Sequence, residues 1–317
     1  MSITPTLDYK AEVVADSTTA FGTRLTTLLV TFPRDILPEF MTHRVFSRNS
    51  GSARAMPSSK MIEQVLTNPY IPRRVGRNKP GMQASEYLTG ADYDKFVQED
   101  LVRRDRAVYG AYEMLLGAER THEVSPDINN PDFKALAEAW KEGDKEGMLN
   151  LHKQNVNRQI AHWQWNTTLV TSTEWENFIA LRDHEDADPS IQPIAPLMRE
   201  ALDASTPNIL EPDDWHAPFL DEDELFALNT TGDLSLLDVS AGRCARLSYL
   251  THYGKRDLDA DISLATHLRQ NFHMSPFEHV ATPLSDGSQW SGNFRGWFQY
   301  RKSFMYESNF GAIPAPQ

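Results

Sequence analysis

The stretch RLTTLLVTFPRDILPEFMTHRVFSRNSGSAR, Arg24–Arg54, decides the fold that we expect for this chain. Its first part, Arg24–Val30, is apolar and rich in β-branched residues, which predicts a strand. Pro33 and Pro38 then mark a turn that leads into the segment Thr42–Arg54. These last thirteen residues carry one imidazole, three guanidiniums and four hydroxyls. The pattern predicts a strand followed by a polar binding segment.

The charges around this segment indicate a site for an anion. Residues 34–83 contain nine Lys/Arg and three Asp/Glu, a net charge of +6, whereas the whole chain has a net charge of −13. Guanidiniums match the oxygens of phosphate, and serine hydroxyls add further donors. The alternative for such a charge run is a basic loop that is only solvated.

The chain has 317 residues, of which 40% are hydrophobic, and aromatic residues are frequent. This composition predicts a globular protein. No apolar run approaches the ~20 residues of a membrane span, and Met1–Asp8 has no features of a secretory signal. The single cysteine, Cys244, excludes an intrachain disulfide and fits a reducing compartment. The net negative charge argues against general nucleic-acid binding. We therefore expect a cytoplasmic protein with no membrane or nucleic-acid partner.

Hydrophobic periodicity predicts both helices and extended segments. We expect helices over Asp92–Glu119, Glu146–Trp165 and Asp261–Asn271, and extended structure over Leu234–Leu250. Thr173–Glu176 has the pattern of a capping box that opens a further helix. Cys244 would then lie inside a strand, as a buried structural thiol.

These elements predict an α+β fold, with a curved, mainly antiparallel sheet flanked by helices. We expect one domain over residues 1–317, with an inserted loop and helical region at about residues 57–146. The acidic stretch within residues 205–234 is the best candidate for a linker.

A second group of polar residues lies in HMSPFEH, His273–His279. Two histidines and a glutamate could ligate a metal. However, Pro276 prevents both imidazoles from lying on one helix face, so we expect no metal and a helix end that turns into a strand.

Two further groups are predicted on helices. Asn155, Arg158 and His162 are spaced by three and four residues and would share one helix face. The segment NFIALR, Asn177–Arg182, ends an apolar helix on an arginine, whose alternative role is to satisfy terminal carbonyls.

Taken together, these segments resemble the flavin-dependent thymidylate synthases, the ThyX family. Thr42–Ala55 is similar to the family's RHRxxS and NExSxRY signature, and His273–His279 to its HxS/TPxEH motif. Arg246–Tyr249 resembles the ARxS(F/Y) strand that opens the family's domain. Asn177–Arg182 resembles its NFLxLR helix, and Arg158 the arginine of its ExxR helix.

The chain also departs from the family pattern at several positions. The first Arg of RHR is replaced by Thr42, and the Glu of NExS by Ser50. The Tyr that follows is replaced by Ala55, and the Glu of ExxR by Asn155. The HxSPxEH segment follows the RHR segment here, whereas it precedes it in the family, so the chain resembles a permuted member. These changes leave open which pyrimidine is the substrate.

The resemblance implies FAD as cofactor, with methylenetetrahydrofolate and NADPH as co-substrates, in a homotetramer whose sites lie at subunit interfaces. It assigns catalysis to Arg182 and Arg158, with Arg182 stabilising charge on the pyrimidine. Contacts to a deoxypyrimidine monophosphate are implied for Glu39, Ser50, Gly51, Ser52, Arg54, Arg158 and Arg182. Contacts to the flavin are implied for His43, Arg44, Ser47, Asn177, Ser248, His273, Ser275 and Glu278.

Three functions follow as alternatives. Methylation of dUMP is the default expectation. Hydroxymethylation of dUMP or dCMP is a close relative, in which water rather than hydride completes the reaction. A non-catalytic nucleotide- or nucleic-acid-binding protein on a degenerate ThyX fold is the alternative from another class, supported by the basic residues Arg73–Lys79.

Overall fold

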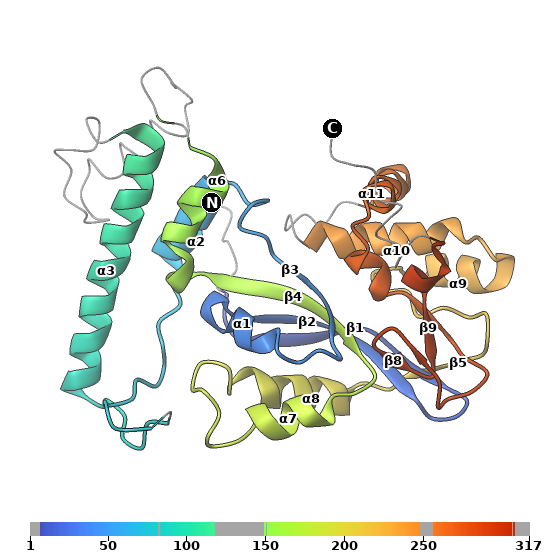
Figure 1. The fold of residues 1–317 in the computed structure, drawn as a ribbon, viewed down its shortest axis with the longest axis horizontal. Coiled ribbons are helices and arrows are strands. Elements are labelled where there is room, and N and C mark those ends of the chain that lie inside the picture. The colour runs from blue at the N-terminus through green and yellow to red at the C-terminus, as the bar shows by residue number, and fades with distance from the viewer. Residues whose placement is uncertain are drawn as a thin grey trace.

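A five-stranded sheet forms the centre of the computed structural model, which describes residues 7–81, 83–117, 149, 151–247, 256–305 and 307 (Figure 1). The strand order is β3-β4-β2-β1-β5. Three neighbouring pairs are antiparallel and β1–β5 is parallel, so the sheet is mixed and the α+β class is confirmed. The strands are β1 (Lys10–Thr19), β2 (Arg24–Pro33), β3 (Ser47–Ser50), β4 (Trp165–Ser172) and β5 (Asn208–Leu210).

The central strand β2 confirms the strand predicted from Arg24, and it continues to Pro33. On one face of the sheet, Leu28, Val30 and Phe32 pack into a core with helices α7 (Glu176–Arg182) and α8 (Ile194–Ala204). These helices cover the lower face of the sheet in Figure 1. This aromatic and aliphatic core fixes α7 against the sheet and so places its last residue, Arg182.

A separate helical unit packs beside the sheet (Figure 1). Its helices α2 (Ser58–Thr67), α3 (Ala91–Leu116) and α6 (Lys153–Gln159) share one apolar cluster. The helix predicted from Asp92 is confirmed as α3. The helix predicted over Glu146–Trp165 is too long: α6 ends at Gln159, and Trp165 already begins β4. Residues 118–146 of the expected insertion lie outside the described residues.

The extended segment predicted over Leu234–Leu250 is wrong, because helix α10 (Ser235–Arg246) occupies it. Residues 236–245 are all buried, and periodicity does not distinguish a helix buried on all sides from a buried strand. Gly242 allows α10 to approach α11 (Leu258–Gln270), since a Cβ there would lie 2.4 Å from the Asp261 carbonyl oxygen. Cys244 is buried as expected, but in this helix.

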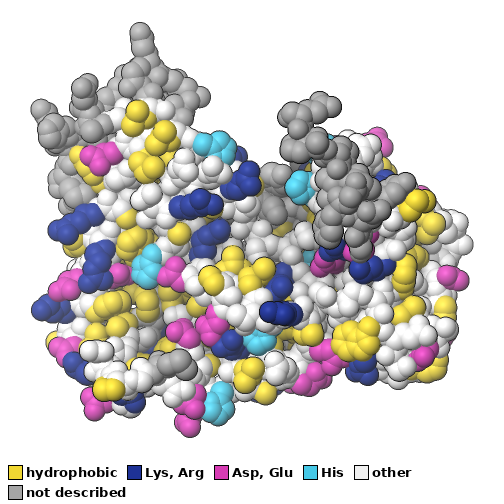
Figure 2. Space-filling view, viewed as in Figure 1, with side chains coloured by type: hydrophobic (Ala, Val, Ile, Leu, Met, Phe, Trp, Pro, Cys, Tyr) yellow, Lys and Arg dark blue, Asp and Glu magenta, His cyan; other side chains and the backbone are white. Residues whose placement is uncertain are grey.

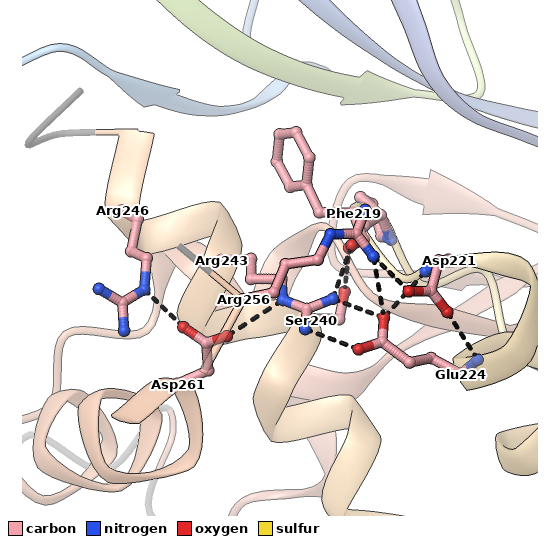
Figure 3. Close-up of polar contacts among 9 residues, drawn as sticks. Phe219, Asp221, Glu224, Ser240, Arg243, Arg246, Arg256 and Asp261 are labelled. Atoms are coloured by element: carbon pink, nitrogen blue, oxygen red, sulfur yellow. Dashed lines mark hydrogen bonds and ion pairs between the residues drawn. The ribbon is translucent and has the colours of Figure 1, made fainter. Parts of the chain in front are cut away.

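An ion-pair network joins α9 (Glu222–Thr231), α10 and α11 (Figure 3). Asp261 is fully buried and accepts hydrogen bonds from Arg243 Nε at 3.1 Å and Arg246 Nε at 2.5 Å. Arg243 also donates to both oxygens of Glu224, at 2.6 and 2.7 Å. The network fixes α11, from which the chain continues into the HMSPFEH segment.

The acidic residues near 211–224 take part in regular structure. Asp221 and Glu224 form a capping box at the start of α9, and β5 pairs with β1 within the stretch that we considered a linker. The capping box predicted at Thr173–Glu176 is wrong: α7 begins there, but the Thr173 hydroxyl accepts from the Arg295 backbone N–H at 3.2 Å.

The remaining elements are short. They are α1 (Leu37–Phe40), the 3-10 helices at Arg34–Ile36, Ala161–Trp163, Ser275–Glu278 and Tyr300–Ser303, and the strands β6 (Ala281–Pro283), β7 (Trp290–Ser291), β8 (Phe294–Arg295) and β9 (Trp297–Gln299). Among the described residues, none of the helices combines the length and apolar character that crossing a membrane requires.

Candidate functional site

Four of the predicted site residues meet in one cleft of about 510 Å³. His43 and Arg44 come from the segment between α1 and β3, and Asn177 and Arg182 come from α7. The two pairs are more than 130 residues apart in the sequence, since the contact between His43 and Arg182 spans 139 residues. The core that Phe40 of α1 shares with Phe178 of α7 brings these two segments together.

Arg182 connects the two sides of this cleft. Its Nε donates to His43 Nε2 at 3.1 Å, and its Nη1 pairs with the carboxylate of Glu39. The arginine therefore does not cap its own helix, which was the alternative role. Its Nη2 forms no hydrogen bond with any described residue, so N–H groups remain for a ligand.

His43 is the buried support of Arg182. Only 7% of the residue is exposed, and its ring stacks on Phe46 and meets the edge of Phe178. Burial, followed by the charges of Arg182 and Arg48, lowers the pKa of His43 to about 4. Because Nε2 accepts from a guanidinium, the neutral ring carries its proton on Nδ1.

Hydrogen bonds to the backbone hold the segment around His43. The Thr42 hydroxyl donates to the Glu39 carbonyl at 2.7 Å. Arg48 Nη1 donates to the carbonyls of Met41 at 2.8 Å and His43 at 3.2 Å. Thr42 and Arg48 therefore shape the loop, whereas the exposed Arg44 forms no hydrogen bond or ion pair with any described residue.

A second group of predicted residues lies at the other end of β3. The Gly51 N–H donates to the Thr167 carbonyl at 2.9 Å, and Ser50 Oγ is 2.8 Å from Thr168 Oγ1. The following turn is held by α6, because Asn157 Nδ2 donates to the Ala53 carbonyl at 2.8 Å. Within this turn the Ser52 hydroxyl accepts from the Arg54 backbone N–H at 3.2 Å.

Cations gather at this second group. Arg54 and Arg158 are exposed and pair with no carboxylate of the described chain. Arg34 lies near Arg158, and its side chain donates two long hydrogen bonds to described residues, 3.4 Å each, to Gly51 O and Asn166 Oδ1. Burial and the charge of Arg158 lower the pKa of Arg34. Figure 2 shows Lys and Arg side chains gathered over the region of α6.

One predicted neighbour does not join this group. His162 was expected on the same helix face as Asn155 and Arg158, but α6 ends before it. Its Nδ1 instead pairs with Asp35, which raises the pKa of His162.

The HMSPFEH residues lie on a third segment, the 3-10 helix that contacts β3. His273 and Ser275 are exposed, and Glu278 pairs with Arg301. Ser47 is buried, and its hydroxyl accepts from Asn293 Nδ2 at 3.3 Å and Gln299 Nε2 at 3.2 Å. Ser248, the remaining predicted flavin contact, lies outside the described residues.

A buried hydrogen-bond chain crosses the sheet near these groups. Ser17 Oγ is 2.9 Å from His216 Nδ1, and His216 Nε2 is 2.8 Å from Thr27 Oγ1. Thr27 continues to Thr171 at 2.7 Å, and Thr171 to His279 Nδ1 at 2.8 Å. Burial lowers the pKa of both histidines to about 3, so both are neutral. His279 is thus packed, and the described residues contain no group of three or more potential metal ligands.

Several site residues were not identified from the sequence. Glu174, Trp290 and Arg295 line the cleft, and Arg34 joins the second group. For Arg34 the local excess of positive charge was a signal. Trp290 and Arg295 had no such signal, because a short hairpin far along the chain from α7 brings them to the cleft.

Comparison with known proteins gives only a partial likeness. Two crystal structures of a UMP/dUMP methylase PolB from Streptomyces cacaoi, bound with 5-Br UMP and 5-Br dUMP, match this chain at 16% and 15% identity. Their TM-scores are 0.39 and 0.40, and the matches cover 62% of this chain and 94% and 90% of theirs. No protein-family model and no curated protein sequence matches this chain. A likeness of this degree does not assign a reaction to the chain.

Proposed function

We propose that this protein is a flavin-dependent enzyme that transfers a one-carbon group to carbon 5 of a deoxypyrimidine monophosphate, with dUMP as the default substrate. The observation that carries the proposal is the convergence of His43, Arg44, Asn177 and Arg182 on one cleft. These residues come from two separate motifs of the family resemblance. Clefts of several hundred Å³ are of the size that holds a small molecule or cofactor.

The donor groups of the cleft fit a flavin. The ring system of a flavin presents carbonyl oxygens and ring nitrogens, and its diphosphate is anionic. Asn177 offers an exposed amide, and Arg44 offers an exposed guanidinium that pairs with no described residue. Guanidiniums match phosphate oxygens in geometry and charge.

Arg182 has the role of an electrostatic stabiliser in this proposal. Glu39 and His43 hold its guanidinium through Nη1 and Nε, which leaves the N–H groups of Nη2 for a pyrimidine oxygen. A donor that is fixed before the reaction stabilises developing negative charge without reorganisation. His43 is the positioning residue, because its neutral ring accepts the Arg182 Nε–H.

The second group supplies the contacts for the nucleotide phosphate. The Arg34 guanidinium donates to the Gly51 carbonyl, and the charge of Arg158 is close enough to lower the pKa of Arg34. Arg54 follows in the same turn as Ser52. β3 separates this group from the cleft by about 10 Å along the strand, at roughly 3.3 Å per residue. The expected homotetramer, with sites at subunit interfaces, remains part of the proposal, since a second copy could complete each group. Sedimentation analysis measures this state directly.

Bound in reduced form, FAD would supply the electrons that convert the methylene carbon of methylenetetrahydrofolate into a methyl group, and NADPH would restore them. The pyrimidine would lose the proton on its carbon 5 when the one-carbon group is attached there. If water adds instead of hydride, the product is the hydroxymethyl pyrimidine. The masses of the two products differ by one oxygen atom.

The test is the visible absorption spectrum of the purified protein before and after addition of FAD, and then of dUMP or dCMP. We expect a bound-flavin band that shifts with one of the nucleotides, followed by product formation when methylenetetrahydrofolate and NADPH are added. Mass spectrometry of the product then distinguishes methylation from hydroxymethylation.

Replacement of Arg182 by alanine is the matched variant, and Arg199→Ala on the neighbouring helix α8 is its control, since Arg199 pairs with Asp183 at the surface. Arg199→Ala should keep the flavin band and the turnover. A protein that binds nucleotide but retains no flavin, even when FAD is supplied, would contradict the proposal and favour the non-catalytic binding protein.

A further inference from the structure

Part of the cleft lining comes from the hairpin of β7 and β8. Trp290 and Arg295 are directly opposite each other in this hairpin, so their side chains lie on the same face. Both line the cleft together with Arg44 and Arg182. Their neighbour Phe294 points the other way and is fully buried in a small core with Leu25, Ala281 and Trp297.

Trp290 differs in its exposure from the other tryptophans. Of the six whose side chains are described, it alone is exposed, at 53%, whereas Trp163, Trp175 and Trp297 are buried. A large aromatic surface left in water at a concave site is a common feature of ligand-binding surfaces. Leu181, also 53% exposed, lines the same cleft from α7. The cleft therefore has apolar surface on both walls.

The hairpin holds Trp290 in place rather than leaving it on a free loop. Gly292 and Asn293 form its two-residue turn, and Gly292 has φ +59°, which glycine adopts without strain. Asn293 Nδ2 donates to the Ser47 hydroxyl at 3.3 Å. The Arg295 backbone N–H donates to the Thr173 hydroxyl at 3.2 Å, and its Nε to Glu174 at 2.8 Å. The turn is thus attached to β3, and β8 to the residues that precede α7.

The charges of the cleft select the kind of ligand. Arg44, Arg182 and Arg295 line the cleft together with Glu174. Glu174 pairs with Arg295 and Glu39 pairs with Arg182, whereas Arg44 pairs with no carboxylate among the described residues, so these groups leave a net positive charge. An indole beside an excess of guanidiniums suits a planar heteroaromatic ring that carries negative charge.

We infer that Trp290 is a stacking residue, supported by Arg295, for the heteroaromatic ring of an anionic ligand bound between the β7–β8 hairpin and α7. This inference rests on the proposed function, in which FAD, the pyrimidine nucleotide and the folate all have this chemistry. None of the motifs that suggested the function includes either residue.

The test compares Trp290→Ala and Trp290→Phe with Phe226→Ala, a control that removes an aromatic side chain 70% exposed on α9, away from the cleft. FAD, dUMP, dCMP and methylenetetrahydrofolate are titrated separately by calorimetry, and thermal unfolding checks that each variant is folded. We expect Trp290→Ala to raise the Kd of at least one ligand by roughly 5- to 100-fold, the scale of one aromatic stack. Trp290→Phe should lose less, and Phe226→Ala should match the unsubstituted protein. The affected ligand identifies which ring stacks.

Two results would overturn the inference, and they are distinguishable. If the unsubstituted protein binds at least one of the ligands and Trp290→Ala binds each equally well, the stacking role is wrong while the proposed function stands. If the unsubstituted protein binds none of them, both are wrong. As a second readout, ligand binding should quench part of the tryptophan fluorescence, and Trp290→Phe should lose that quenching.

Discussion

Acid should unfold this protein through three buried histidines, His43, His216 and His279. Each is at least 93% buried, and each has a pKa lowered from 6.5, to about 4 for His43 and about 3 for the other two. The unfolded chain therefore binds these protons at a higher pH than the folded chain does. Their contribution to stability is complete above pH 6.5 and is lost as the pH falls toward the folded-state values.

The magnitude follows from these pKa values. Between pH 7 and pH 4.5, each histidine costs about 2–3 kcal/mol of unfolding free energy, and the three together roughly 7 kcal/mol. Domains are typically stable by about 5–15 kcal/mol, so we expect acid unfolding between about pH 4 and pH 5. His162 acts in the opposite direction because Asp35 raises its pKa, but that pair is nearly half exposed and its effect is small.

The assay is urea unfolding, followed by circular dichroism at several pH values between 7 and 4.5. Replacing His216 by glutamine should lower overall stability, because it disturbs the bonds to Ser17 and Thr27, but it should also reduce the pH dependence by about one third. His184→Gln is the control, because His184 is exposed. A pH dependence that is the same in His216→Gln and in the unsubstituted protein would refute the reasoning.

Three further predictions concern single side chains. Arg182→Ala should abolish turnover while the protein stays folded, with a stability loss of about 1–3 kcal/mol because the buried His43 Nε2 loses its donor; near-normal turnover would remove Arg182 from the proposed mechanism. Arg54→Ala should weaken nucleotide binding by about 1.5–3 kcal/mol, the scale of a hydrogen bond to a charged group, and unchanged affinity by calorimetry would contradict that role. Asp261→Ala should cost about 3–5 kcal/mol of unfolding free energy, because Arg246 loses its carboxylate partner and the buried Arg243 loses one of its two. The control is Glu12→Ala, which removes an exposed ion pair with Lys10 and should cost less than about 1 kcal/mol of unfolding free energy. Equal losses in the two variants would refute the assigned role of burial.

The sequence predicted elements where the local pattern was unambiguous. The β-branched run from Arg24 became β2, and the long amphipathic pattern from Asp92 became α3. It failed over Leu234–Leu250, where helix and strand are both compatible with a run of buried residues. There, the contact between Gly242 and Asp261 on another helix favours the helix, and local periodicity contains no information about that contact.

For the candidate site, the sequence identified several of the side chains but did not indicate which of them lie close together in the folded protein. It singled out His43, Arg44, Asn177 and Arg182, and the fold brings these four together. It also assigned Arg54 and Arg158 to the same nucleotide substrate as Arg182, whereas the fold places them at the opposite end of β3 from Arg182. A motif records which side chains are present, but the distance between two motifs depends on how the sheet and helices pack.

The α+β class, the central strand and the polar segment that follows it could be predicted from the sequence alone, because these depend on local composition and spacing. Only the tertiary structure decided that His43 is a neutral support for Arg182, since burial sets its pKa. Only the tertiary structure brought Trp290 and Arg295 to the cleft, because a hairpin near the C-terminus packs against β3 and the start of α7. Such contacts between distant segments are made by the packing of the whole core, which no local pattern encodes.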